Sequence, residues 1–549
     1  MNNSVGESER AMNRRKFLQL TAVGTAQALT IFPTRAVSSR RTDLVPASVH
    51  YPASELEECT LADFQAAMQL GKETAVSLTR KYLSRIDAMN QRGPRLRAVL
   101  EANPDALAIA HALDHERKAH GPRGPLHGIP VLVKDNLDTH DRMMTTAGSL
   151  ALLGSIAPRD AFVVQKLREA GAVILGKTNL SEWANFRGDR SSSGWSGRGG
   201  QTTNPYALDR NPSGSSSGSA VAVAANLCAV AIGTETDGSI VSPAAVCGVV
   251  GLKPTVGLVS RSGIIPISKS QDTAGPLART VTDAAILLAA LTGVDPRDEA
   301  TELSRSQSQL DYRRFLDPNG LRGARLGVAR IYFQASAPAA KLLAAALDQM
   351  KALGATLVEF DDDLGKSSGH EEEVLEYEFK AGINAYLAAL GPQAPVHDLE
   401  EIIDFNVRNQ ERELAFFGQE TMIQSQARGS LTDQTYLEAL ANCRRLARAE
   451  GIDAVMNRHQ LDAIIAPAGG PAGKTDHVYG DRDVGGSSSP AAVAGYPNIT
   501  VPAGHWFGLP VGISFFGRAW SEPVLLKLAF AFEQGTNARK PPTFRPTVD

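Results

Sequence analysis

A serine on a glycine-rich turn is the first residue whose setting suits chemistry. Gly238 and Ser239 lie where a largely apolar run, residues 220–232, gives way to a polar turn, and a second mostly apolar run follows over residues 240–252. A serine held on such a turn can present its hydroxyl and several backbone N–H groups to one point, which is what acyl transfer requires of a nucleophile and an oxyanion site. An ordinary Gly/Ser turn accounts for this stretch alone equally well.

A serine hydroxyl is a poor nucleophile and needs a base. No Gly-x-Ser-x-Gly elbow surrounds Ser239, and His127, between two prolines, is interpreted as structural. Lys134 ends an apolar strand predicted over residues 129–133. Burial lowers the pKa of a lysine and makes the neutral amine available as a base. A solvated lysine at a strand end is the alternative, and it is favoured when this stretch is considered alone.

A third polar segment, Ser213–Ser219, reads SGSSSGS. Its composition alone is that of a flexible linker. An almost wholly apolar helix is predicted immediately after it, over residues 220–230. The segment is therefore better interpreted as a tight loop at a helix N-terminus, where backbone N–H groups are free. Lys134, this segment and Ser239 together make a Ser–Lys acyl-transfer site a reasonable hypothesis.

Two other motifs are rejected. Residues 171–178, GAVILGKT, spell the Walker A pattern, but the residues between the glycines are predicted to form a strand, whereas a P-loop needs a flexible loop there. His111 and His115 are four residues apart on a predicted helix, without the glutamate of a metalloprotease or a nearby carboxylate or cysteine cluster. The helix is interpreted as a surface helix, and no metal or cofactor is expected.

The elements that must position these residues alternate between strands and helices. Apolar strands are predicted over residues 172–175, 326–329, 461–465, 498–501 and 511–516, with amphipathic helices and Gly/Pro-rich loops between them. This alternation predicts an α/β fold with a mixed or mostly parallel sheet. Residues 371–450 are predicted to be helical, and form either a lid or pocket wall or an outer layer.

Composition narrows the class of protein. The chain has 549 residues, 43% hydrophobic and 21% charged, with a formal net charge of −3. This composition is typical of a globular protein, and the charge balance indicates no basic face that would bind nucleic acid. The four cysteines form no CxxC pair, so neither a zinc ribbon nor a disulfide framework is expected.

The first 40 residues are interpreted as an export signal. Paired arginines, Arg14 and Arg15, precede a mildly hydrophobic segment over residues 20–32 that is too short and too polar to span a membrane comfortably. This arrangement resembles a twin-arginine signal, to which the twin-arginine translocase binds transiently. We therefore expect a periplasmic or secreted protein, with no stable membrane association after export, whose enzymatic domain occupies residues 41–549.

Several segments together resemble the amidase signature family. The match runs through GSSSGSA at 214–220, GTETDGSI at 233–240 and CGVVGLKPT at 247–255. GIPVLVKDN at 128–136 and GYPNITVPAG at 495–504 resemble further family segments. Because these segments occur in the family's order over nearly the whole chain after the signal, the resemblance is highly specific. It implies a single large domain with a mixed central sheet flanked by helices.

The resemblance also implies a catalytic mechanism. It assigns Lys134 as the base, Ser215 as a bridging serine that follows a cis peptide bond, and Ser239 as the nucleophile of a Ser–Ser–Lys triad. Ser239 would attack an amide carbonyl to form an acyl-enzyme, which water would hydrolyse. The oxyanion hole would consist of the backbone N–H groups of Thr236, Asp237, Gly238 and Ser239.

Departures from the common family pattern bear on the substrate. Glu235 and Asp237 replace the frequent Asp and Gly, and Val241 stands where the glutamyl-tRNA amidotransferase subunits carry Arg. The sequences of residues 194–201 and 233–240 are most similar to those of bacterial peptide amidases, so C-terminal peptide amides are the expected substrates. Small aryl or aliphatic amides are the alternative within the fold, and a non-catalytic binding protein is the alternative outside enzymes.

Overall fold

The computed structural model describes residues 55–335, 339–482 and 485–548. The export signal predicted over residues 1–40 lies outside these ranges. No helix among the described residues combines the length and the apolar character needed to cross a membrane.

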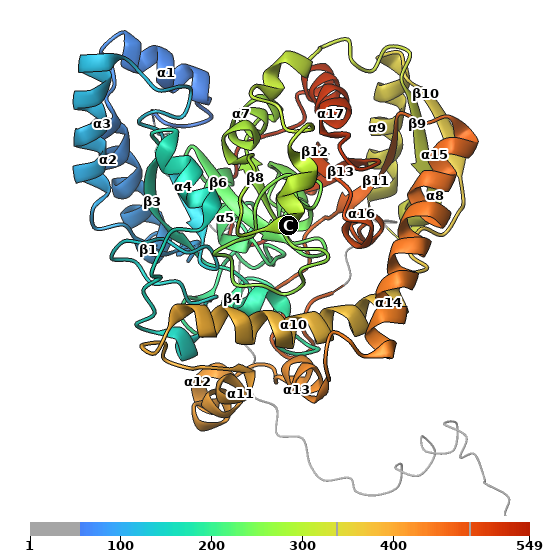
Figure 1. Ribbon diagram of the computed structural model, residues 1–549. Helices are drawn as coiled ribbons and strands as arrows, with labels where there is room; N and C mark the ends of the chain where they lie inside the picture. The colour runs from blue at the N-terminus through green and yellow to red at the C-terminus, as the bar shows by residue number, and fades with distance from the viewer. Residues whose placement is uncertain (1–54, 336–338, 483–484, 549) are drawn as a thin grey trace, which may run out of the picture. The chain divides into compact units, whose positions relative to one another are not determined.

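An 11-stranded sheet forms the centre of the fold (Figure 1). From edge to edge its strands follow the order β1-β3-β2-β6-β8-β7-β12-β13-β11-β9-β10. The strands of this sheet are β1 Val99–Ala102, β2 Pro130–Lys134, β3 Val173–Thr178, β6 Val230–Glu235, β7 Val250–Lys253, β8 Thr273–Ala278, β9 Arg325–Ala329, β10 Thr356–Phe360, β11 Ala463–Gly469, β12 Asn498–Trp506 and β13 Leu509–Phe516. A separate hairpin pairs β4 Trp195–Ser196 with β5 Gly200–Gln201.

The sheet is mixed, as predicted. β2 runs parallel to both β3 and β6, and β9 runs parallel to both β10 and β11. Between these two parallel groups the ladder from β6 through β8, β7, β12 and β13 to β11 is antiparallel. The carboxyl ends of β2 and β6 therefore lie side by side at the same end of these parallel strands, which is where α/β proteins commonly bind their ligands.

Helices flank the sheet and bury its largely aliphatic faces (Figure 1). They are α1 Leu61–Gln69, α2 Ala75–Ile86, α3 Ala106–His120, α4 Phe162–Glu169, α5 Ser217–Ala224, α6 Val241–Val246, α7 Val281–Leu291, α8 Arg330–Ala335, α9 Ala340–Ala352, α10 Ser368–Leu390, α11 Leu399–Arg408, α12 Gln410–Glu413, α13 Glu420–Ala427, α14 Gln434–Arg444, α15 Asp453–His459, α16 Ser489–Ala494 and α17 Glu522–Thr536. Threonines begin three of them: the hydroxyls of Thr60, Thr74 and Thr280 accept hydrogen bonds from the first-turn amides of α1, α2 and α7.

The region predicted to be helical over residues 371–450 contains α10 to α14. Figure 1 shows the long helix α10 crossing one end of the molecule, with α11, α12 and α13 beyond it. A separate apolar cluster, which includes Phe379, Ile383 and Met422, packs this region against Trp183 and Ile265, which lie outside it. Its part in shaping a substrate pocket stays a prediction.

The helix predicted over residues 220–230 is wrong in its bounds. The helix α5 covers Ser217–Ala224, and β6 already begins at Val230. Asn226, with φ 55, lies in the left-handed region and separates the two elements. Every residue of α5 is buried, so its apolar side chains show no period that would distinguish a buried helix from the buried strand that follows.

Candidate active site

Lys134 is the last residue of β2, and its side chain is fully buried. The amine Nζ donates to Ser215 Oγ at 2.8 Å and to Thr234 Oγ1 at 2.8 Å. Weaker contacts reach Ser216 Oγ at 3.1 Å and the Thr234 carbonyl at 3.3 Å. The interpretation of Lys134 as a solvated strand-end lysine is therefore wrong.

Burial sets the charge of this amine. Desolvation lowers the pKa of Lys134 from its ordinary value of 10.5 to about 7, although the carboxyl groups of Asp272 and Glu235 act in the opposite direction. The groups in direct contact with Nζ are hydroxyls and a carbonyl, and no carboxylate of the described residues forms an ion pair with it. The neutral amine is thus well populated near neutral pH, as a general base requires.

Ser215 follows a cis peptide bond, Gly214–Ser215, as the family resemblance implied. Its side chain is fully buried where the chain enters α5, and its carbonyl accepts a hydrogen bond from the Ser181 amide at 3.1 Å. The serine-rich segment is therefore an ordered loop at a helix N-terminus, and the linker interpretation is wrong.

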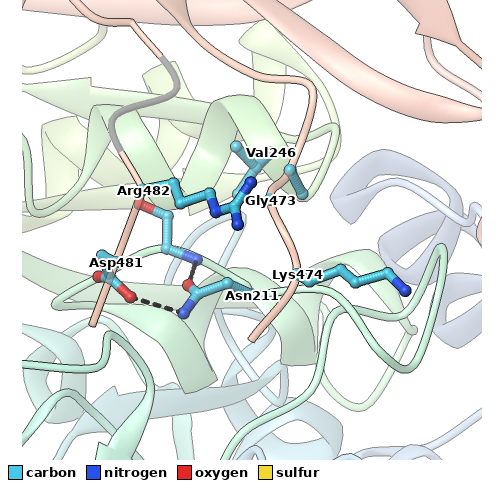
Figure 2. Close-up of a pocket in the computed structure, with 8 residues that line it drawn as sticks. Asn211, Val246, Gly473, Lys474, Asp481 and Arg482 are labelled. Carbon is cyan, nitrogen blue, oxygen red and sulfur yellow. Dashed lines mark hydrogen bonds between the residues drawn. The ribbon is translucent and has the colours of Figure 1, made fainter. Parts of the chain in front are cut away.

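A chain of hydrogen bonds fixes the residues just before Ser215 (Figure 2). The Ser213 amide donates to Asn211 Oδ1 at 2.7 Å, and Asn211 Nδ2 donates to Asp481 Oδ1 at 2.8 Å. Asp481 also accepts from the Ser193 amide, at 3.0 and 3.1 Å. Sequence reasoning missed Asn211 and Asp481, because no local pattern connects two residues that are 270 positions apart.

Ser239 lies in the loop between β6 and α6, and its backbone carbonyl accepts a hydrogen bond from the Ser216 amide at 3.1 Å. The residue is 6% exposed, and within the described part of the chain its hydroxyl forms no hydrogen bond, including none to Ser215. The structure therefore brings Lys134 and Ser215 into direct contact and holds Ser239 beside them through the backbone, with its hydroxyl free.

The backbone amides proposed for the oxyanion hole are available to bind a ligand oxygen. The backbone N–H groups of Thr236, Asp237, Gly238 and Ser239 donate to no other described residue. Gly238 has φ 78, which favours glycine, and its carbonyl accepts from the Ser242 amide at 2.8 Å. A turn with several free amides beside a serine hydroxyl can bind an oxyanion.

Glu235 stabilises this turn by hydrogen bonds to backbone amides, a role that the sequence did not reveal. Its carboxylate Oε2 accepts hydrogen bonds from the Ile240 amide at 2.7 Å and the Val241 amide at 3.0 Å, at the N-terminus of α6. Glu235 is buried, and desolvation raises its pKa while Lys253 acts in the opposite direction. The side chain therefore closes the loop that carries Ser239.

A buried ion pair attaches the loop of Ser181 to the helical region. Arg187 is fully buried, binds Glu182 at 2.5 Å and donates to the Phe417 carbonyl at 3.1 Å. Its guanidinium also stacks on the Phe417 ring, 3.9 Å from the centroid. Glu413 completes the group at 3.7 Å from Arg187, and burial together with neighbouring Glu182 raises the pKa of Glu413 to about 9.

The motifs rejected from the sequence have structural explanations. The residues between the two glycines of GAVILGKT belong mostly to β3, which pairs with β1 and β2, so they form no phosphate loop. His111 and His115 are exposed on α3, as expected of a surface helix. His127 is fully buried, with Nε2 2.9 Å from the Leu113 carbonyl, in agreement with a structural role.

Comparison with known proteins identifies the family. The Amidase family model matches residues 77–526. A peptide amidase solved in complex with the competitive inhibitor chymostatin is 53% identical, with a TM-score of 0.86 over 88% of this chain and 99% of that one. The native peptide amidase of Stenotrophomonas maltophilia is 52% identical, with a TM-score of 0.85 over 89% and 99% of the two chains.

Relatives outside the bacteria agree. A probable amidase of Arabidopsis thaliana is 44% identical over 500 residues, which cover 89% of this chain and 92% of the relative. The protein is a hydrolase that acts on amide C–N bonds. It belongs to the amidase family, as the motifs predicted, and its similarity to peptide amidases is confirmed.

Proposed function

We propose that the protein hydrolyses C-terminal peptide carboxamides to acids and ammonia through Lys134, Ser215 and Ser239. The full burial of Lys134 in hydrogen-bond contact with Ser215 carries this proposal. A neutral amine in that position can accept the Ser215 proton, and Ser215 can then accept the proton of Ser239.

The reaction follows from these contacts. Ser239 Oγ attacks the carboxamide carbon, and the free amides of residues 236–239 stabilise the negative charge on the oxygen. The protonated Lys134 returns its proton through Ser215 to the departing nitrogen, which leaves as ammonia. Water then attacks the ester of Ser239 by the same proton route and releases the acid.

The peptide substrate is inferred from similarity. The two structures that resemble this chain at 53% and 52% identity are peptide amidases, and chymostatin is a competitive inhibitor of the first. Small aryl or aliphatic amides remain the second candidate, since the Arabidopsis relative is described only as a probable amidase. The two classes differ in the acyl group that the pocket must accept, and they share the reacting carboxamide.

The test is ammonia release from a short C-terminally amidated peptide, with mass spectrometry of the product and a small aryl amide assayed in parallel. Hydrolysis replaces NH₂ by OH, so the product is heavier by about one mass unit, and Ser239→Ala abolishes the reaction. Faster turnover of the aryl amide contradicts the peptide assignment. Ligand binding that survives Ser239→Ala, with no turnover by the wild type, indicates the non-catalytic alternative.

We also propose that residues 1–40 direct export through the twin-arginine translocase. Arg14 and Arg15 before a mildly hydrophobic segment support this proposal. Replacing both arginines with lysine and fractionating a bacterial host tests it. Periplasmic enzyme that disappears in the variant supports export, whereas an unchanged distribution contradicts it.

A further inference from the structure

Two carboxyl groups meet beside the predicted oxyanion hole. Asp237 belongs to the turn itself, and its Oδ1 is buried without an N–H or O–H partner among the described residues. Glu371, in the first turn of α10, is buried, and its carboxyl interacts with that of Asp237. Nothing in the proposed reaction uses Glu371, which comes from the helical region rather than from the sheet.

Gln271 connects the same two elements. Its Nε2 donates to Glu371 Oε1 at 2.8 Å and approaches the Thr236 carbonyl at 3.4 Å. The Thr236 carbonyl and the Asp237 amide belong to one trans peptide unit, in which C=O and N–H point in opposite directions. A carbonyl held toward Gln271 therefore turns the Asp237 N–H away from Gln271, so this contact fixes the direction of one proposed oxyanion donor.

The contacts also locate a proton. Gln271 donates to Glu371 Oε1, so this oxygen acts as an acceptor, and Oε2 is left to carry a hydrogen toward Asp237. Two buried carboxylates in contact repel each other, and a shared proton removes the repulsion. Burial and the charge of Asp237 accordingly raise the pKa of Glu371 well above its usual range.

The surroundings of the two carboxyl groups differ. Lys253, on β7, faces Asp237, and no cation of the described residues contributes to the environment of Glu371. The other groups that face the pair are neutral or acidic. The titratable groups around Asp237 and Glu371 are Lys253 of β7, Glu235 of β6, Tyr332 of α8 and Cys443 of α14.

We propose that Glu371 is a positioning residue for amide hydrolysis, which in its protonated form donates a hydrogen bond to Asp237 and, with Gln271, fixes the oxyanion turn against α10. This inference rests on the proposed function of residues 236–239. Glu371 acts through the direction of the Asp237 amide, so its effect belongs to the transition state, where the oxyanion is bound, rather than to substrate affinity. Loss of its proton places two negative charges against each other and loosens the turn.

Three variants test the role of Glu371 on whichever amide the wild type hydrolyses. Glu371→Gln keeps an acceptor for Gln271 and a donor for Asp237, so kcat stays within about threefold and the loss of activity at alkaline pH disappears. Glu371→Ala removes both, and kcat falls about 10- to 100-fold with little change in KM. The matched control is Glu372→Gln, at an exposed neighbouring position, which retains the wild-type pH profile.

Several results would overturn the proposal. One is a loss of activity at alkaline pH that persists in Glu371→Gln. The others are a wild-type kcat in Glu371→Ala, or a change in that variant that is confined to KM. Infrared difference spectra supply a readout without turnover. The carbonyl band of a protonated carboxyl at neutral pH is lost in Glu371→Gln and kept in Glu372→Gln. If the wild type hydrolyses no amide, the proposed function fails, and the spectra alone decide: an unchanged band refutes the protonated pair, and its loss supports it.

Discussion

Replacing the buried lysine tests the central physical claim about the site. Lys134→Met keeps an unbranched side chain of similar length and removes the titrating amine. The pKa of Lys134 falls from 10.5 to about 7 on folding. The unfolded chain therefore binds this proton more tightly, and between about pH 7 and pH 10.5 folding releases it. The free energy of unfolding contributed by this residue consequently rises with pH in that window and is lost as the pH falls toward 7.

The magnitude follows from the two pKa values. The full slope is 1.36 kcal/mol per pH unit, and it is half developed at pH 7, where the native amine is half protonated. Between pH 7 and pH 9 the wild type should gain about 2 kcal/mol of stability relative to Lys134→Met. Lys253, whose pKa burial lowers to about 8, titrates in both proteins, and its contribution cancels in the difference.

Urea denaturation at pH 7, 8 and 9 measures this difference. Comparing slopes with pH avoids the packing change caused by the substitution, which is independent of pH. A difference in the free energy of unfolding that stays constant over this range would show that Lys134 keeps its charge when buried, and the reasoning for a neutral base would fail. The variant should also lose activity, while wild-type kcat/KM should fall below about pH 7 as the amine becomes protonated.

Three further substitutions probe the surroundings of the site. Glu235→Ala leaves the amides at the start of α6 without their carboxylate acceptor; kcat should fall at least tenfold, and an unchanged kcat would show that the turn holds itself. Gly218→Ala places a Cβ 2.3 Å from the Ala98 carbonyl; calorimetry should show destabilisation of about 2 kcal/mol or more, and a wild-type Tm would contradict the close approach. Arg187→Met leaves Glu182 buried without its cation; chemical denaturation should show a loss of about 3–5 kcal/mol in the free energy of unfolding, and wild-type stability would mean that the Arg187–Glu182 pair contributes nothing net.

The sequence was sufficient for the parts of the fold that depend on local patterns. Short apolar runs located β9, β11 and β13. Boundaries failed where apolar residues run on without a period, as between α5 and β6. There the left-handed conformation of Asn226 separates the elements, and composition does not predict it.

The candidate site divides in the same way. Lys134 and Ser239 were candidates because an apolar run ends just before each of them, whereas Ser215 was assigned within the serine-rich segment only through the family resemblance. Residues that support them from a distance, Asp481 and Glu371, carry no local signal. Their contacts with Asn211 and Gln271 exist only after segments far apart in the chain have come together.

The pairing of β2 with β6 has a consequence for how the enzyme should lose activity on heating. Lys134 ends one strand and the turn of Ser239 follows the other, and their ladder lies near the middle of one half of the sheet. Core strands open only with global unfolding, whereas peripheral elements can open separately. Thermal inactivation caused by separation of base and nucleophile should thus have the cooperativity of the whole domain, and residual activity would serve as a direct count of molecules whose core is still folded.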